Sequence, residues 1–295
     1  MKGNEFRDKV CLSANQCVNN FRFFLIEKQQ GTDSKAVSYL TDPVDGVLGL
    51  ALGANKGRIG PLYAKALFPM TSVSPPTFAF YLDDVGKDSW IDFGGFKKSA
   101  IKDEKADKIT WLQIKKDNFF WSTNCLGLGF GTITNTDKII KFQRLIGEEM
   151  VYTIFNTGDT KTKIPSAMWN LFLAYLMNPD NEISFKLVSG QVLLNCADRS
   201  KLRPLYFLFE GNNWLVMDPE DYSYVIDWAD DFGCTVAFES YPFAYFTLGT
   251  SFFKGYYAIH DMKDAKLGFV PHATSRKALN GGLETDNPED EFSVP

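Results

Sequence analysis

The sequence predicts a mainly β protein. Aromatic residues make up 15% of the 295 residues, and 26 of them are phenylalanine. Aromatic side chains are enriched in strands. Short aromatic and β-branched runs recur between polar turns, for example over residues 21–27 and 205–209. Helical spacing of apolar residues is clear only over residues 165–176, where Pro165 marks a helix start, and a shorter helix is indicated over 59–68.

Composition limits the function classes. The net charge is −5, and no basic stripe with interleaved aromatics is present, so we expect no nucleic-acid partner. No apolar run reaches membrane-spanning length, so no membrane span is predicted. The first ten residues show no apolar segment of a signal peptide.

Cysteine and histidine usage argues against a metal or another cofactor. The chain has no Cys-x-x-Cys pair and only two histidines, His260 and His272, which we expect to be surface or packing residues. A zinc site and catalysis by a Ser-His or Cys-His pair are therefore disfavoured. Two disulfides and one free thiol are the preferred state of the five cysteines, and five reduced cysteines are the alternative. Cys11 and Cys17 flank a predicted turn and form a candidate pair.

A charged stretch divides the chain into two predicted lobes. Residues 97–108 are nearly free of large apolar groups, as linkers between domains often are. We therefore expect one lobe over residues 1–105 and another over 106–273. Residues 274–295 are polar and acidic and are predicted to form a disordered tail.

Glycines punctuate three apolar segments. Gly46 and Gly49 predict close backbone approach or tight bending inside a sheet. Residues 47–49, Val-Leu-Gly, have an echo in Thr-Leu-Gly at 247–249. The glycines of residues 127–131 lack the spacing of a nucleotide-binding loop, so we expect a strand and a turn there.

The stretch IFNTGDT, residues 154–160, carries the main functional signal. It has the pattern of an apolar strand that ends in a polar turn, with a helix soon after. This setting suits a catalytic carboxylate, yet the residue at the turn is the amide Asn156.

The order of several segments resembles pepsin-like aspartic proteases from about residue 3 to 272. DGVLGLAL resembles the family's Asp-Gly-Ile-Leu-Gly-Leu segment, and SWIDFGG resembles its Leu-x-Phe-Gly-Gly hairpin. YFTLGTSFFKGYYAIHDMKDAKLGFVP resembles the family's Ile-Leu-Gly-Asp-x-Phe, Tyr-x-x-Phe-Asp and hydrophobic-Gly-Phe-Ala segments. In this resemblance Asn156, Thr157 and Gly158 stand at the second Asp-Thr-Gly motif.

The resemblance implies a bilobal pepsin-like fold that hydrolyses peptide bonds. It implies an extended peptide or protein ligand in the cleft between lobes, a monomer, and a secreted or lysosomal/vacuolar location. It also implies a disulfide between Cys196 and Cys234 and leaves Cys125 unpaired. The match begins past the place of the first aspartate and the flap, so the first lobe is expected to be incomplete, with unpaired strand edges and uncovered apolar faces.

The departures from the family imply impaired catalysis. Family members use two carboxylates that share one proton, one acting as base and the other as acid. The sequence contains no Asp-Thr-Gly or Asp-Ser-Gly, and an asparagine cannot ionise. Asp159 stands where the family has Ser or Thr; we expect an exposed turn aspartate, with a displaced catalytic residue as the alternative.

Two functions therefore follow from the sequence. The first is an aspartic-type endopeptidase family member that is catalytically impaired. The alternative is a pseudoenzyme that binds extended peptides in the groove between lobes without cleaving them.

Overall fold

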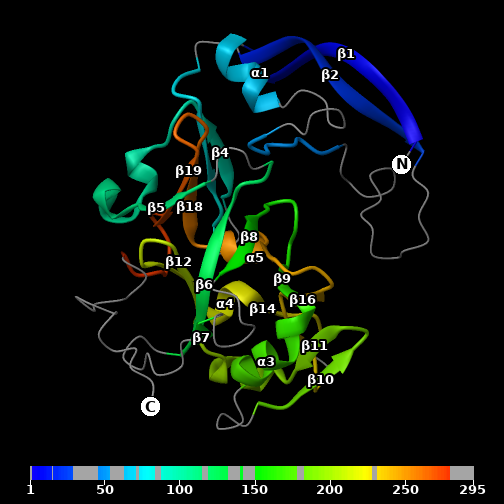
Figure 1. Cartoon of the computed structure of the whole chain (residues 1–295), viewed down its shortest axis with the longest axis vertical. Coiled ribbons are helices and arrows are strands. Elements are labelled where there is room, and N and C mark those ends of the chain that lie inside the picture. The colour runs from blue at the N-terminus through cyan, green and yellow to red at the C-terminus, as the bar shows by residue number, and fades with distance from the viewer. Residues whose placement is uncertain are drawn as a thin grey trace.

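The computed structural model describes residues 2–14, 16–28, 46–53, 63–70, 73–83, 88–114, 119–131, 140–141, 150–177, 183–227 and 231–279. Strands dominate the described residues, which confirms the mainly β prediction. They form three multi-stranded sheets and one separate hairpin. Figure 1 shows the hairpin at one end of the molecule's long axis and the sheet that contains β10 and β11 at the other.

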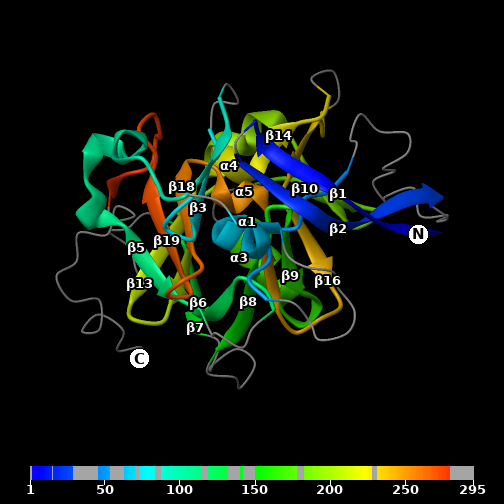
Figure 2. The same cartoon turned by 90° about the horizontal axis from the view of Figure 1, so that it is seen from above.

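The central sheet joins segments from both predicted lobes. Its five antiparallel strands run in the order β4 (Trp90–Phe93), β3 (Thr77–Tyr81), β18 (Tyr256–Asp261), β19 (Lys266–Pro271) and β5 (Thr110–Gln113). Strands from before residue 106 therefore pair directly with strands from near the C-terminal end. Seen from above, β5, β18 and β19 lie on one side of the molecule, and β9 and β16 lie on the other (Figure 2).

The largest sheet carries the IFNTGDT stretch. Its order is β13 (Asn213–Met217), β12 (Leu205–Phe209), β6 (Ser122–Phe130), β8 (Val151–Phe155), β17 (Phe246–Leu248), β9 (Thr162–Pro165) and β16 (Phe238–Tyr241), with β7 (Ile140–Lys141) beside β6. β8 and β17 are parallel neighbours. The predicted strand and turn at residues 127–131 are confirmed, because β6 ends at Phe130.

A smaller sheet and the helices complete this part of the molecule. The sheet consists of β10 (Phe185–Val188), β11 (Gln191–Leu194), β15 (Cys234–Val236) and β14 (Ser223–Val225). The predicted helix over residues 165–176 is present as α3 (Ser166–Met177), and α4 (Pro219–Tyr222) and α5 (Thr250–Phe253) are short. A disulfide joins Cys196, in the 3₁₀ helix η6 (Cys196–Lys201), to Cys234, as expected, and Cys125 is a buried free thiol.

The N-terminal hairpin packs mainly on one helix. β1 (Lys2–Ser13) and β2 (Gln16–Lys28) are antiparallel, and the expected disulfide joins Cys11 to Cys17. α1 (Tyr63–Met70) covers the hairpin, and the Tyr63 hydroxyl donates a hydrogen bond to the Val10 carbonyl at 3.1 Å. Large apolar side chains of the hairpin are exposed, namely Phe6, Leu12, Phe24 and Leu25.

The charged stretch at residues 97–108 lies against the central sheet. It forms three 3₁₀ helices: η1 (Lys98–Ala100), η2 (Lys102–Glu104) and η3 (Ala106–Lys108). Ile101 is buried here together with Tyr257 and Val270. The stretch therefore covers one face of the sheet. The division into lobes at residue 106 stays a prediction.

The sequence predicts a disordered tail from Thr274, but the first residues of this segment are part of the folded structure. Lys277 is buried, and its ammonium group forms ion pairs with Asp221 and with Asp218, the latter at 3.3 Å. Lys102 Nζ also donates to the carbonyls of Ser275 and Lys277, at 2.9 and 2.8 Å. Residues 274–279 are therefore part of the folded structure, and residues 280–295 lie outside the described residues.

The two glycine segments that echo each other have different surroundings. A Cβ atom at position 249 would clash with the Lys161 carbonyl oxygen and lie 2.6 Å from that of Asp159. Gly249 therefore permits the 159–161 backbone to cross β17 at close range. Nothing lies within 4 Å of a Cβ at Gly46 or Gly49, and residues 46–53 form no strand, so the expectation of close approach there is wrong.

Both histidines pack inside the molecule. His260, on β18, is 3% exposed, and its ring stacks on Phe78 at 4.5 Å between centroids and meets Trp121 edge-on at 4.9 Å. His272 stacks on Tyr81 at 4.3 Å. Burial among apolar rings disfavours the charged imidazolium and lowers the pKa of His260 to about 3.

We expect Gly249→Ala to lower the free energy of unfolding by about 1–3 kcal/mol, because the added methyl group meets backbone carbonyls that cannot move aside cheaply. Gly49→Ala is the matched control and should change it by less than about 0.5 kcal/mol. Urea unfolding followed by circular dichroism measures both. Equal effects of the two substitutions would show that the close crossing at residue 249 is not formed in solution.

We also expect His260→Phe to change the pH dependence of stability. The unfolded histidine takes up its proton near pH 6.5, whereas the folded one does so near pH 3. Between these values the unfolded state binds more protons, so this histidine makes stability fall as the pH falls, by up to about 1.4 kcal/mol per pH unit. Urea unfolding at pH 7, 5 and 4 should show a smaller loss in the variant. Parallel curves would contradict the buried neutral histidine.

Candidate functional site

The turn that contains Asn156 is fixed by its neighbours on both sides. The Phe155 backbone N–H donates to the Trp121 carbonyl at 2.8 Å, and that of Asn156 donates to the Leu248 carbonyl at 2.9 Å. The Phe155 ring is buried and lies 5.2 Å from the Phe269 ring, centroid to centroid. The turn therefore begins where β8 leaves the sheet between β6 and β17.

The Asn156 side chain satisfies both of its polar atoms inside its own turn. Its Nδ2 donates to Asp159 Oδ2 at 2.7 Å, and its Oδ1 accepts from the Gly158 backbone N–H at 3.0 Å. An ionised carboxylate can only accept hydrogen bonds, so Asp159 fixes which end of the amide faces it. The amide therefore acts as a bracing group of the turn.

Asp159 is held by a lysine and is not the exposed turn aspartate expected from the sequence. Its side chain is 26% exposed, and its Oδ1 lies 2.8 Å from Lys163 Nζ. Lys163 Nζ lies 4.0 Å from Glu239 and 5.1 Å from the centre of the Tyr241 ring. The Asp159 carboxylate thus has an amide donor on one oxygen and an ammonium on the other.

The three predicted site residues lie together at one pocket. Asn156, Thr157 and Gly158 line a cavity of about 470 Å³, which we call the Asn156 pocket. Most of its wall is apolar and aromatic, and includes Leu48, Leu50, Phe78, Phe80, Phe120 and Trp121. No carboxylate stands among the described residues that line it. The described part of the pocket wall therefore offers apolar contact surface and no carboxylic acid or base.

His260 also lines the Asn156 pocket, whereas the sequence predicts only a surface or packing residue there. It stands where the family resemblance has the phenylalanine of Tyr-x-x-Phe-Asp. The sequence signal for this residue was a histidine in a strand where the family segment has a phenylalanine. Its Nδ1 lies 3.2 Å from the Ala258 carbonyl, which can only accept, so Nδ1 carries the proton of the neutral ring.

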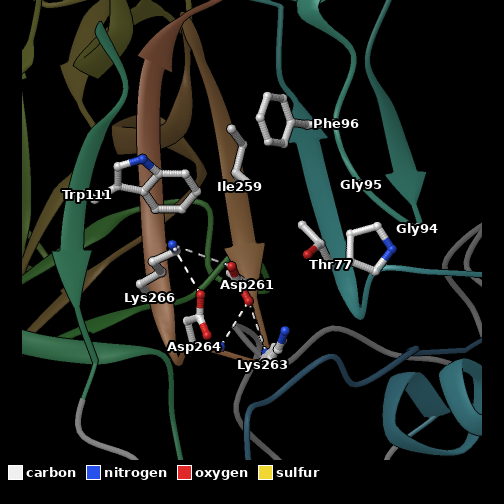
Figure 3. A pocket seen from close by; sticks show the side chains of 11 residues that line it. Thr77, Gly94, Gly95, Phe96, Trp111, Ile259, Asp261, Lys263, Asp264 and Lys266 are labelled. Carbon is white, nitrogen blue, oxygen red and sulfur yellow. Dashed lines mark hydrogen bonds and ion pairs between the residues drawn. The ribbon is translucent and has the colours of Figure 1, made fainter. Parts of the chain in front are cut away.

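A second pocket lies on the central sheet and contains two carboxylates (Figure 3). Its volume is about 520 Å³. Lys266 Nζ lies 3.7 Å from Asp261 and 3.4 Å from Asp264, and 4.5 Å from the centre of the Trp111 ring. Asp261 Oδ1 also accepts the backbone N–H groups of Lys263 and Asp264 at 3.0 Å each. These carboxylates close the turn between β18 and β19 and share a lysine, so they do not form a proton-sharing pair.

The described ranges contain no group of three or more histidine, cysteine, aspartate or glutamate side chains placed to hold a metal ion. No helix within them is long and apolar enough to cross a membrane.

Comparison with known proteins identifies the family. The family model described as eukaryotic aspartyl protease matches residues 1–272. A vacuolar aspartic protease of Candida albicans is 25% identical over 252 residues, which cover 82% of this chain and 54% of that protein. Vacuolar protease A of Neurospora crassa is 26% identical, covering 82% and 55%. Mouse gastricsin is 24% identical, covering 86% and 59%.

The chain thus spans a little over half the length of these relatives. The matched residues include β3, β4 and the IFNTGDT turn. The chain therefore belongs to the eukaryotic aspartyl protease family.

Proposed function

We propose that this chain is a catalytically impaired relative of the aspartic-type endopeptidases. The observation that carries the proposal is the Asn156 side chain, whose amide bonds to Asp159 and Gly158 in place of a titrating carboxyl group. An amide neither takes a proton from water nor gives one to a carbonyl oxygen at the pH values at which carboxyl groups titrate. General acid and base groups each contribute about 10²- to 10⁴-fold to such reactions, and paired groups act as a unit.

Asp159 does not replace the missing acid in this proposal. It lies three residues after Asn156 in the same turn, and its carboxylate contacts both the Asn156 amide and Lys163 Nζ. The Asn156 pocket is lined by other residues. The Asp159 carboxylate is therefore not placed to activate water at the pocket.

Peptide binding without cleavage is the second candidate function. It is favoured by the Asn156 pocket, whose apolar and aromatic walls suit a side chain of an extended peptide. Extended peptides dock through backbone hydrogen bonds, and pockets that receive alternate side chains supply the specificity.

The names of the relatives support a location. Two relatives are named as vacuolar proteases, and we extend a vacuolar, lysosomal or secreted location to this chain. The two disulfides support this, because such bonds persist in oxidising compartments. A monomer remains our expectation, which sedimentation would test.

We expect the purified chain to leave casein and fluorogenic peptides uncleaved at pH 3–5, because residue 156 supplies no proton-transfer group. An active family member under the same conditions is the positive control. Turnover that pepstatin abolishes would overturn the proposal.

We expect Asn156→Asp to destabilise the fold at pH 7 by about 1–3 kcal/mol without producing hydrolysis. The substitution places a second carboxylate against Asp159 and removes the N–H donor. Repulsion raises the folded-state pKa of one carboxyl above its unfolded value, so the loss should be full at neutral pH and shrink as the pH falls toward 4.

The double variant Asn156→Asp/Asp159→Thr is the matched control, because a hydroxyl can donate to the new carboxylate. Its free energy of unfolding at pH 7 should exceed that of the single variant. If Asn156→Asp is as stable as the original chain at pH 7, the amide–carboxylate contact does not exist in solution.

A further inference from the structure

Lys277 forms a buried ion pair outside the part of the chain that matches the family. The family model ends at residue 272, whereas the Lys277 side chain reaches back to α4 and contacts the Asp221 carboxylate. The Lys277 and Asp221 side chains are only 1% and 2% exposed. An amine and a carboxyl group are therefore enclosed together, away from solvent.

The surrounding backbone holds the Lys277 side chain in this position. A Cβ atom at Gly255 would lie 2.7 Å from Lys277 Cε, so the glycine leaves the space through which the lysine passes. Lys277 Nζ donates to the Val216 carbonyl at 3.2 Å and lies 5.0 Å from the centre of the Tyr256 ring. These contacts keep the nitrogen atom beside the Asp221 carboxyl group.

A second carboxylate lies beside the pair. Asp218 Oδ2 is 3.3 Å from Lys277 Nζ, and the Asp218 side chain is 31% exposed. The Asp218 backbone N–H also donates to Asp221 Oδ2 at 2.9 Å, which fixes the buried carboxyl group. The nitrogen atom thus faces one buried carboxyl group and one part-exposed carboxylate that can exchange protons with solvent.

Burial favours the uncharged forms of the Lys277–Asp221 pair. Desolvation raises the pKa of Asp221, and the opposing effect of the Lys277 charge is smaller. Transfer of one proton from the ammonium to the carboxylate replaces two buried charges by a neutral amine and a neutral acid. A neutral amine is a nucleophile, so this is the state from which an amide can form.

We propose that Lys277 and Asp221 form an intramolecular isopeptide bond, with Asp218 as the general base. Lys277 Nζ forms a bond to Asp221 Cγ. Asp218 accepts one proton from the nitrogen and passes it to the hydroxyl group of the acid, which leaves as water. In sum, one ammonium and one carboxylate become an amide and a water molecule, no other reactant is consumed, and Asp218 ends ionised as it began.

Proximity and burial both favour this condensation. Groups held in contact react as one molecule, and effective molarities of well-oriented intramolecular reactions reach about 10⁵–10⁸ M. The product also buries a neutral amide in place of two charges, which removes most of the desolvation cost of the pair. The bond ties the residues after β19 to α4, and it is independent of the proposed peptidase relationship and peptide binding.

The mass of the intact chain tests the proposal. After reduction of both disulfides and denaturation, we expect mass spectrometry to give the mass of the sequence minus one water molecule. Proteolysis should yield one branched peptide that contains Asp221 and Lys277, which excludes loss of water elsewhere in the chain. If the intact mass equals that of the sequence, the two residues form an ion pair only and the proposal is overturned; this measurement needs no variant to fold.

Two lysine-to-arginine variants identify the nitrogen atom. Lys277→Arg keeps the positive charge but supplies a guanidinium group that stays protonated, so this variant should have the full mass of its sequence. Lys102→Arg is the matched control, because Lys102 Nζ holds the same segment through the Ser275 and Lys277 carbonyls, at 2.9 and 2.8 Å, and should leave the loss of water unchanged. A loss of water that persists in Lys277→Arg overturns the proposal.

Asp218→Asn tests the general base. An asparagine cannot accept the proton, and general acid–base groups contribute about 10²- to 10⁴-fold to a rate. In samples taken at intervals after the start of expression, the linked form of this variant should therefore accumulate at least about 10²-fold more slowly than that of the original chain. Equal rates overturn the assignment of Asp218.

Discussion

The candidate site depends on one close backbone crossing, where residues 159–161 pass over Gly249. Gly249 has no Cβ atom, so it leaves room for the carbonyl groups of residues 159 and 161. Any other residue would place its Cβ atom against these carbonyl groups. The crossing places the Thr250 N–H within 2.7 Å of the Asp159 carbonyl, so the turn after β8 and the start of α5 are bonded to each other. The contact between Asn156 and Asp159 thus lies in a turn whose two ends are held by backbone hydrogen bonds.

In that turn, the positions of the hydrogen-bond donor and of the carboxylate are exchanged relative to those expected for a proteolytic centre. The resemblance places a carboxyl group of the family at position 156 and a serine or threonine at position 159. Here the amide of Asn156 donates through Nδ2, and the carboxylate stands three residues later beside Lys163. The two side chains complement each other, because one donates and the other accepts. The turn thus holds a hydrogen bond with a side chain at residue 156 that does not titrate.

The sequence contained enough information for the β architecture, α3 and the place of the IFNTGDT turn, because strand-forming runs and helical spacing are local properties. The environment of a single residue was harder to predict. Gly49 and Gly249 stand in similar triplets, yet only the second meets another backbone, and that backbone lies nearly ninety positions away. His260 acquires its aromatic surroundings from Phe78 and Trp121, which are still more distant along the sequence. The sequence predicts an exposed turn residue at Asp159. Its ion pair with Lys163 was missed because it depends on the direction in which β9 continues after the turn.

The buried ammonium of Lys277 extends the folded unit beyond strand β19. Strand β19 stops at Pro271, but Asp221 and Asp218 receive their counter-charge from a residue beyond it. Shortening the protein directly after its last strand would keep every sheet intact and still leave the nearly inaccessible Asp221 carboxylate without a cation. Losing one partner of a buried ion pair typically removes about 3–5 kcal/mol. Expression boundaries for this region therefore belong after Leu279, in spite of the polar composition that begins at Thr274.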